Sequence, residues 1–355
     1  MRRVAQLLIF TLFTSSLVCL AKKKKKTDEE MTQVLALPKD PPGAVVADVP
    51  RLIFHVSPLS SKGLLSQQTR DALKSLLQQT KGAQIVSIRA FVAGSGDLRR
   101  VQTILSEVLT EKKMNLPALS VVQVGGLPLA GAQVVLESVA TDRRVQNEHG
   151  LGFLSGQAST MRDVLGPLQK MTEKAGFSAD SVRRITCFLS DLDNVGVVRA
   201  KAQTAFPSAA LDVVQLQRST LEDFAECEAV AALSTTPEKA MSFFEPESGK
   251  SSQIAIVGPG KVALTGTQVG FRFQDEDIRQ AFGRLGKTLE SVGGSFKNIA
   301  VTHLYPLNRR TADRIEKIRF EFCDPAMPPA NTLLLFEGLP GLDAAFAIDV
   351  IAVLR

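Results

Sequence analysis

The 355-residue sequence contains no tryptophan and a single tyrosine, Tyr305. Proteins that bind single-stranded nucleic acid stack bases on exposed aromatic rings, so this chain is poorly supplied for that function. It also has only three histidines, His55, His149 and His303, which are scattered along the sequence. This arrangement gives no sign of a metal-binding trio or of a nucleophile with its base. We therefore expect neither a metal nor another cofactor.

Cysteine is scarce as well, with four residues in the chain. Cys19 lies in an apolar N-terminal stretch, and Cys187, Cys227 and Cys323 lack the spacing of zinc ligands. Cys187 and Cys227 fall on predicted strands of the same region, where an oxidising compartment would permit a disulfide. We expect buried free thiols there, because cysteine on apolar strands behaves as a small hydrophobic residue. The disulfide is the alternative.

The folded part of the chain also lacks an excess of positive charge, although the formal net charge is +6. Arg2, Arg3 and the five lysines at 22–26 supply seven of the 42 basic residues, which leaves 35 against 36 acidic residues. A basic stripe that neutralises phosphates is therefore not predicted, and we expect no nucleic-acid partner.

The N-terminus resembles a signal peptide. Two arginines precede an apolar stretch at 4–20 that is short for a bilayer span, and Cys19 and Ala21 are small residues at the cleavage-site positions. We expect cleavage after Ala21, export to the periplasm or the medium, and a lysine-rich tether at 22–31 near the membrane. Acylation of Cys19 and an uncleaved anchor held by residues 22–26 are the alternatives.

A short pattern recurs three times and ends each of three stretches of the chain. It consists of an apolar strand that follows a proline, a turn, and a second apolar strand. The copies occupy residues 117–140, 206–231 and 329–352. A chain of this length with 45% hydrophobic residues can form two or three domains with real cores.

The same order of elements precedes each copy. Apolar residues at helical spacing predict a first helix, which ends at Gly82, Gly176 and Gly293 in the three copies, as a left-handed C-terminal cap requires. A β-branched strand follows at 84–91, 182–189 and 299–305, and then a second helix at 97–109, 194–206 and 311–323. The predicted order is a strand hairpin, helix, strand, helix and two strands.

Three motifs of the middle copy resemble the Rid family, the YjgF-type reactive-intermediate deaminases. They are Gly152-Phe153-Leu154-Ser155-Gly156-Gln157, the strand at 187–193, and Glu226-Cys227-Glu228-Ala229-Val230-Ala231. Residues 262–266 match less well and residues 52–57 least. The resemblance covers nearly everything after residue 32.

The resemblance implies an α+β fold of the chorismate-mutase-like type, in which a mostly antiparallel sheet carries two helices on one face. Members of the family assemble as homotrimers with ligand clefts between subunits. We therefore expect three RidA-like units, at 32–142, 143–234 and 253–355 with a linker at 235–252, which form an intramolecular pseudo-trimer and leave the chain monomeric. A sheet with helices on one face must cover the other, and neighbouring units would do so. Three separate units are the alternative.

The family's chemistry is only partly retained. In the deaminases an arginine two residues after the proline grips the substrate carboxylate, and this sequence has Leu119, Ala209 and Asn331 there. A glutamate on the last strand helps to place the hydrolytic water, and of the three copies only the middle one keeps it, as Glu226. An acid also recurs two residues beyond this position, and we expect this second set to be structural, either at the rim of the clefts or in polar contacts between units, rather than catalytic. The set is Glu137, Glu228 and Asp349.

The candidate site is therefore assigned by resemblance. The catalytic candidates are Glu226 and Ser155, and the candidate binding residues are Gly156, Arg199, Thr265 and Gly266. Loss of the arginine from all copies favours a diverged binding or scaffold protein, non-catalytic or weakly catalytic, with a small molecule in clefts between units. The alternative is an enamine/imine deaminase, a hydrolase, with one competent cleft in the middle copy, where Arg199 would supply the guanidinium.

Overall fold

The structure is a computed structural model that describes residues 38–94, 96–218 and 223–354. The expected signal peptide, its cleavage after Ala21 and the lysine-rich tether lie outside the described residues. Within the described ranges, none of the helices combines the length and the apolar character needed to cross a membrane. We refer to residues 44–141, 151–232 and 241–354 as the first, second and third segments.

The first segment follows the predicted order of helix, strand, helix, strand and strand, but its two opening strands do not pair with each other as the predicted hairpin requires. Its elements are β1 (Ala44–Asp48), β2 (Leu52–Val56), α1 (Leu65–Gln79), β3 (Gln84–Ala93), α2 (Leu98–Glu111), β4 (Ala118–Val124) and β5 (Val134–Thr141). The apolar face of α1 is buried, including Leu73 and Leu76. Asp97 caps the N-terminus of α2, and its carboxylate accepts a hydrogen bond of 3.0 Å from the backbone of Arg99.

The second segment differs from the prediction at its start. It contains β6 (Leu151–Ser159), α3 (Gly166–Lys174), β7 (Val182–Leu189), α4 (Val195–Ala205), β8 (Ala210–Gln215) and β9 (Ala225–Ala232). A hairpin was expected before α3, but β6 stands alone. Residues 142–150 form turns instead, because the amides of Asp142 and Gln146 bond the carbonyls of Arg51 and Pro50 at 2.9 and 2.7 Å.

The third segment carries additional short strands. It contains β10 (Met241–Pro246), β11 (Ser252–Val257), β12 (Lys261–Thr265), β13 (Gln268–Phe271), α5 (Asp275–Ser291), β14 (Ile299–Leu304), α6 (Arg309–Ile318), β15 (Ala330–Leu333) and β16 (Ala344–Leu354). Strand β10 lies inside residues 235–252, which the sequence indicated as a linker, and pairs with β11. That part of the chain is therefore structured by its own hairpin.

Strands are ordered alike in the three segments. The last strand is antiparallel to the strands on both its sides, as in β2-β5-β3, β6-β9-β7 and β12-β16-β14. The next strand outward, β4, β8 or β15, is parallel to its neighbour. A parallel pair needs a crossover connection, which α2, α4 and α6 supply.

Strands also pair between segments. Strand β1 of the first segment pairs with β12 of the third, and β11 of the third pairs with β6 of the second. The second and third segments thereby share one 12-stranded sheet that includes β1, while β2-β5-β3-β4 form a separate four-stranded sheet. All described residues fall within one compact unit, Leu37–Arg355.

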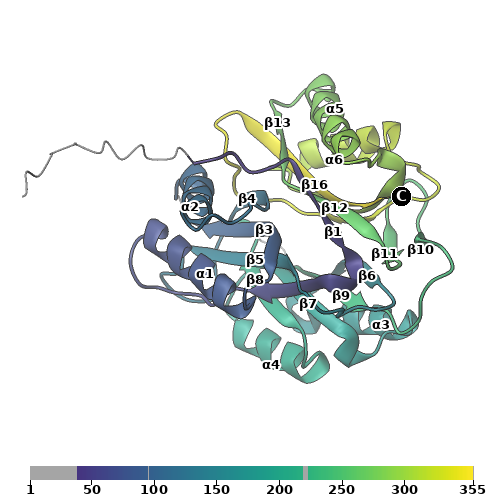
Figure 1. Ribbon diagram of the computed structural model, residues 1–355, viewed down its shortest axis with the longest axis horizontal. Coiled ribbons are helices and arrows are strands. Elements are labelled where there is room, and N and C mark those ends of the chain that lie inside the picture. The colour runs from purple at the N-terminus through teal and green to yellow at the C-terminus, as the bar shows by residue number, and fades with distance from the viewer. Residues whose placement is uncertain (1–37, 95, 219–222, 355) are drawn as a thin grey trace, which may run out of the picture. The chain divides into compact units, whose positions relative to one another are not determined.

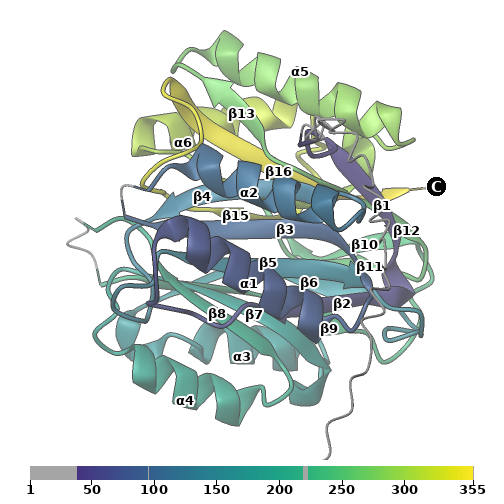
Figure 2. The same ribbon diagram turned by 60° about the vertical axis from the view of Figure 1, so that its left-hand side comes forward.

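Helices cover one face of each segment's sheet, and the three inner faces pack on one another (Figures 1 and 2). Each helical layer has its own apolar core, represented by Leu73, Leu168 and Leu285. On the inner faces Phe91, Phe188 and Phe336, one from each segment, join a common core with ring centroids 5.9 to 6.5 Å apart. The inner faces are therefore buried by neighbouring segments rather than by helices.

The predicted helix ends are confirmed at the glycines that follow the first helix of each segment. Gly82, Gly176 and Gly293 have φ of 85°, 77° and 80°. This left-handed conformation costs glycine little because it has no Cβ. The three helices thus end in the same way.

The expectation of free thiols at Cys187 and Cys227 is wrong, because the two residues form a disulfide. They face each other on the antiparallel strands β7 and β9, with Cα atoms 4.2 Å apart. Directly opposite positions on neighbouring strands bring two thiols within bonding reach, which their separation in sequence does not reveal. Cys323 is a buried free thiol.

Candidate functional site

Three recurring acids occupy equivalent places in the sheets. Glu137 on β5 lies opposite Arg89, Glu228 on β9 opposite Thr186, and Asp349 on β16 opposite His303. On the other side of each of these partners stands a residue of the parallel strand: Ser120, Asp212 or Thr332. Each segment therefore contributes one row of three polar residues at the same depth of its sheet.

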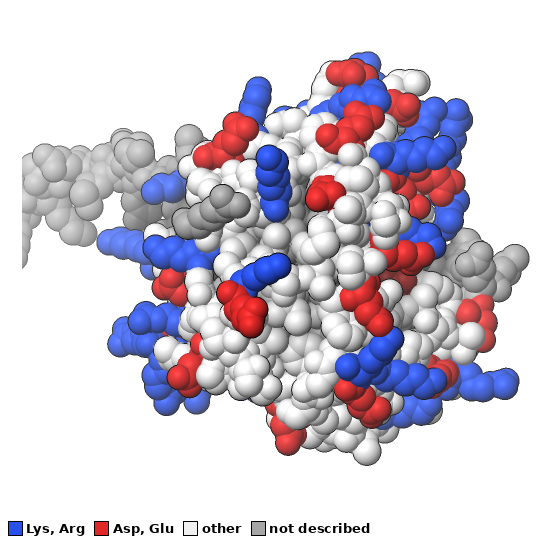
Figure 3. Space-filling model, turned by 90° about the vertical axis from the view of Figure 1, so that its right-hand side faces the viewer, with Lys and Arg blue, Asp and Glu red and all other residues white. Residues whose placement is uncertain are grey.

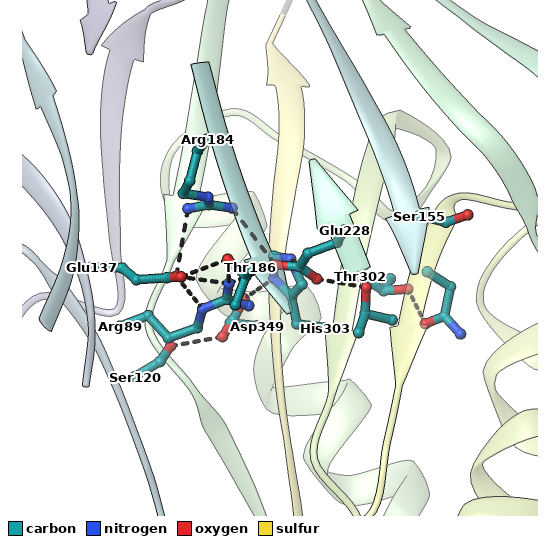
Figure 4. A network of polar contacts seen from close by, with 12 residues as sticks. Arg89, Ser120, Glu137, Ser155, Arg184, Thr186, Glu228, Thr302, His303 and Asp349 are labelled. Atoms are coloured by element: carbon teal, nitrogen blue, oxygen red, sulfur yellow. Dashed lines mark hydrogen bonds and ion pairs between the residues drawn. The ribbon is translucent and has the colours of Figure 1, made fainter. Parts of the chain in front are cut away.

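The three rows meet one another in the interior (Figure 4). Ser120 of the first segment donates a 2.7 Å hydrogen bond to Asp349 of the third. Thr332 of the third segment donates one of 2.6 Å to Glu228 of the second. Asp212 of the second segment lies beside Glu137 of the first. The contacts run from first to third, third to second, and second to first segment, which closes a ring.

Arg89 lies at the centre of this ring and holds two of its acids. Its guanidinium donates to Glu137 at 2.8 Å and to Glu228 at 2.5 Å, and Arg184 lies 3.7 Å from both carboxylates. Burial opposes ionisation of Glu228, but the charges of Arg89, His303 and Arg184 outweigh it and lower the pKa to about 2. We expected these acids to lie at the rim of the clefts or in contacts between units, and the structure shows contacts between units.

Glu226 lies two residues before Glu228 and has different surroundings. It lines a cavity of about 230 Å³ between the second and third segments. The other lining residues are Ser190, Leu216, Gln217, Phe224, Arg309, Leu333, Leu334 and Leu335. Five of these eight residues are apolar and three are polar, and small-molecule sites likewise combine apolar side chains with a few placed polar groups.

Burial, together with the nearby charge of Glu228, raises the pKa of Glu226 to about 8. The carboxyl is therefore largely protonated at neutral pH and presents a hydrogen-bond donor to the cavity. Gly156 packs against it, and a Cβ at this glycine would lie 1.7 Å from Oε1 of Glu226. The serine-glycine turn noted in the sequence thus leaves room for this carboxyl, because only glycine permits such a close approach.

The sheet register corrects one alignment made from the sequence. Leu119 and Asn331 immediately precede Ser120 and Thr332, and the equivalent neighbour of Asp212 is Leu211 rather than Ala209. The second segment has two more residues between its proline and this point of the strand, so counting from the proline fails there. All three positions, Leu119, Leu211 and Asn331, still lack a guanidinium.

Arg309 is a cavity residue that the sequence reasoning missed. It stands at the first position of α6 in the third segment and lines the cavity of Glu226. Its side chain is 80% exposed and pairs with Asp313 at 3.1 Å. Its place at the cavity follows from the packing of the third segment on the second, which no short pattern in the sequence indicates.

The other candidate residues lie apart from this cavity. Ser155 Oγ donates to the carbonyl of Gln253 at 3.1 Å, where β6 and β11 lie side by side. Arg199 lines a different cavity of about 560 Å³ between the first and second segments, so it does not supply a guanidinium to Glu226. Thr265 Oγ1 accepts a 2.9 Å hydrogen bond from the backbone of Val350. A Cβ at Gly266 would lie 2.8 Å from the carbonyl oxygen of Leu119.

The segments meet at three interfaces, which we call seams: the first lies between the first and second segments, the second between the second and third, and the third between the third and first. The three seams differ in the residues that line them. Val135 and Leu211 line the 560 Å³ cavity, so both positions compared here, that of the acid and that of the arginine, hold apolar residues in this seam. Glu226 gives the second seam its acid. In the third seam Ala347 takes the place of the acid, and Gly266 packs on the backbone of Leu119. One seam combines a cavity with an ionisable acid at this position.

Two other properties bear on ligands. The described ranges contain no group of three or more His, Cys, Asp and Glu residues that would hold a metal ion. On the face shown in Figure 3, Lys and Arg side chains alternate with Asp and Glu. That face therefore presents no broad field of a single sign.

No protein-family model matches the sequence, and no curated protein matches it. Parts of the chain are similar to solved structures. A YjgF/YER057c/UK114 family member from Mycobacterium tuberculosis is 13% identical, with a TM-score of 0.25 over 26% of this chain and 79% of that chain. RidA from Psychrobacter sp. PAMC 21119 is 16% identical, with a TM-score of 0.24 over 26% of this chain and 80% of that chain. The Rid-family protein YyfB from Yersinia pestis is 16% identical, with a TM-score of 0.29 over 33% of this chain and 100% of that chain.

Proposed function

We propose that the chain is an intramolecular pseudo-trimer of three Rid-like units that binds a small molecule in one seam and is non-catalytic or weakly catalytic. The ring of contacts from Ser120 to Asp349, from Thr332 to Glu228, and from Asp212 to Glu137 supports the threefold arrangement. A homotrimer must keep its three interfaces alike, whereas a single chain leaves each interface free to diverge. The unequal seams fit such divergence.

The cavity of Glu226 is the proposed binding site, and it is the observation that carries the proposal. A protonated carboxyl beside leucines can donate a hydrogen bond to a carbonyl or imine, and Arg309 at the same cavity can pair with a carboxylate. The ligand class that fits is a small 2-oxo or 2-imino acid. The volume of about 230 Å³ has room for such an acid.

Catalysis is weak in this proposal because the carboxylate clamp is incomplete. Leu119, Leu211 and Asn331 are neutral, and Arg309 is exposed and already paired with Asp313. A ligand carboxylate would therefore be held less firmly than by a buried bidentate guanidinium. The competing proposal is an imine-hydrolysing enzyme, and one observation favours it: a general acid or base works best with a pKa near the working pH, as Glu226 has.

Export and a monomeric chain complete the proposal. The disulfide between Cys187 and Cys227 supports an oxidising compartment, since such bonds persist outside the reducing cytosol. If residues 22–355 form the mature protein, N-terminal sequencing should start at Lys22. Light scattering should give the mass of one chain, and a stable trimer of chains would contradict the pseudo-trimer.

Ammonia release from 2-aminoacrylate-type imines separates binding from catalysis. We expect a rate close to background with the mature protein, while pyruvate, used as a probe, perturbs NMR signals of residues around the cavity. Arg309→Ala should abolish this perturbation, and the adjacent exposed Arg310→Ala serves as the matched control. Fast ammonia release that falls with Glu226→Gln would refute the weakly catalytic proposal and establish the hydrolase. Absence of any effect of pyruvate at the cavity would refute the binding site.

A further inference from the structure

In the seam between the first and second segments, the described structure has no strand at a position that a strand fills in the other two seams. Phe54 of β2, Phe153 of β6 and Leu264 of β12 are equivalent, because each pairs with the residue two places after the recurring acid. On the outer side, Phe153 pairs with Ala255 of β11 and Leu264 pairs with Val45 of β1. Within the part of the chain that the structure describes, β2 has no strand on its outer side. The hairpin strand missing from the second segment would belong there.

A groove lies where that strand is missing. The 560 Å³ cavity is lined by residues of β2 and β8, and a second cavity of about 590 Å³ adjoins it along the end of α1 and residues 142–146. The two cavities share His55 and Gln79. We call them together the β2–β8 groove, and Figure 2 shows β2 and β8 between helices α1 and α4.

The backbone of β2 presents free hydrogen-bonding groups to this groove. Ser57 donates to the carbonyl of Leu136 at 2.8 Å, so Ser57 and the alternate residues His55 and Ile53 bond β5. The amides and carbonyls of Phe54 and Val56 consequently point away from β5. An unpaired edge of this kind is a template for an additional strand.

The opposite wall follows the pattern of an occupied seam. Strand β11 runs antiparallel to β6 and begins parallel to β15, where Ser252 pairs with Ala330. Strand β8 is the counterpart of β15, and in the β2–β8 groove its residues from Ala210 to Val213 form the wall. The groove therefore lies between the edges of β2 and β8, the counterparts of β6 and β15, between which β11 lies.

The charge of the groove selects the occupant. Its lining contains Lys81, Arg143, Arg144 and Arg199, all with exposed side chains, against two acids. Asp212 is buried, and Asp142 accepts hydrogen bonds from the Arg144 amide and the Gln146 side chain at 2.9 and 3.2 Å. The accessible surplus is positive, which attracts an acidic partner.

We propose that the β2–β8 groove binds an extended acidic peptide segment of a partner protein, which adds as a strand to the outer edge of β2. Backbone hydrogen bonds to Phe54 and Val56 supply affinity, and the four basic side chains select acidic residues on the solvent-facing side of the strand. This inference is independent of the proposed function, because the groove is separate from the cavity of Glu226.

The test uses a blocked synthetic peptide of about eight residues in which valine and glutamate alternate. With the mature full chain, we expect measurable binding by fluorescence anisotropy and slower hydrogen exchange at the amides of Phe54 and Val56, by at least about tenfold. The same peptide with lysine in place of glutamate should bind about tenfold more weakly or not at all. A version with prolines at alternate positions should lose binding, because proline removes the donors that a strand needs.

The matched protein variants are the double charge reversals Arg143→Glu/Arg144→Glu and Lys287→Glu/Lys297→Glu. The first should weaken binding of the glutamate peptide about tenfold, and the second, on exposed positions outside the groove, should leave it unchanged. Equal binding of the lysine or proline peptide, or protection at amides other than those of β2, would overturn the proposal. So would protection of Phe54 and Val56 that rises with protein concentration in the absence of peptide, since a second copy of the chain would then fill the groove.

Discussion

Glu226 and Glu228 stand two residues apart on β9 and are both buried, yet their carboxyls differ by about six units of pKa, with values of about 8 and about 2. Glu228 belongs to the ring of contacts at the centre, where Arg89 donates to it at 2.5 Å and Thr332 at 2.6 Å. Glu226 faces a cavity lined by both apolar and polar residues and has no cation bonded to it in the described structure. Burial alone therefore does not set ionisation, and the available partners decide it.

The comparison separates two roles for acids in one strand. The carboxylate of Glu228 accepts hydrogen bonds from residues of the other two segments, so its role is to stabilise the fold and not to bind a ligand. Glu226 lacks such partners, so its protonated carboxyl can donate a hydrogen bond to a ligand in the cavity. Strongly shifted groups at a cavity are candidates for function, whereas those inside ion-pair networks are structural.

The largest expected effect comes from breaking the central ring. Arg89→Leu leaves Glu137 and Glu228 buried without their main cation, which should lower the free energy of unfolding by about 3–5 kcal/mol. Urea unfolding at neutral pH measures this. The control is Arg100→Leu, which breaks a more exposed pair with Glu107 and should cost about 0–1 kcal/mol. Equal losses for the two variants would show that the ring is not a stabilising network.

Glu228→Gln should sharpen the comparison on the acidic side. The pKa of Glu228 is lowered from 4.5 to about 2 in the folded chain, so its stabilising contribution is present above pH 4.5 and is lost as the pH falls towards 2. The advantage of the wild type over the variant should shrink by about 2 kcal/mol between about pH 6 and pH 3. Unfolding free energies of both proteins at several pH values test this. An advantage independent of pH would contradict it.

Glu226→Gln should give the opposite slope. The pKa of Glu226 is raised from 4.5 to about 8, so ionisation penalises the folded state increasingly as the pH rises through this range. Relative to the variant, the wild type should lose on the order of 1–2 kcal/mol between about pH 5 and pH 7, less than the full shift implies because the carboxyl opens onto a cavity. The same unfolding series measures it. A variant that is less stable at pH 7 than at pH 5, relative to the wild type, would refute a protonated Glu226.

The smallest effect concerns restored chemistry. Val135 and Leu211 both line the 560 Å³ cavity, and the residues at the equivalent positions of the second and third segments are Glu226 and Asn331. Asn331→Arg should therefore raise ammonia release from 2-aminoacrylate-type imines about fivefold, since it adds a counter-charge in the seam with the acid. Ala209→Arg, chosen by counting from the proline, should give no gain. A gain from Ala209→Arg alone would show that the register assignment fails.

Local patterns in the sequence predicted local structure well. Helical spacing, the β-branched runs and the glycines at 82, 176 and 293 act over a few residues, and the corresponding elements and caps are present. The recurring acids were also visible, because their spacing in the closing pattern repeats. Contacts between segments, one of the two structural roles expected for them, are present too.

Relations between distant residues were not readable in the same way. Three findings depend on which strands lie side by side. They are the pairing of β1 and β11 with strands of other segments, the absence of a strand at 142–150, and the disulfide of Cys187. The two-residue register difference at Leu211 and the arrival of Arg309 at the cavity depend on the same tertiary pairing. A period of two or 3.6 residues carries no information about such pairing.

The central claim is that β9 carries one acid held ionised by the ring and one kept protonated at a ligand cavity. Carbon-13 NMR of the glutamate carboxyls, titrated in the mature full chain and assigned through Glu226→Gln and Glu228→Gln, tests it directly. The account predicts that Glu226 titrates with a pKa of about 8 and that Glu228 stays ionised down to about 2. Two carboxyls that titrate together near 4.5, the ordinary value for glutamate, would contradict it.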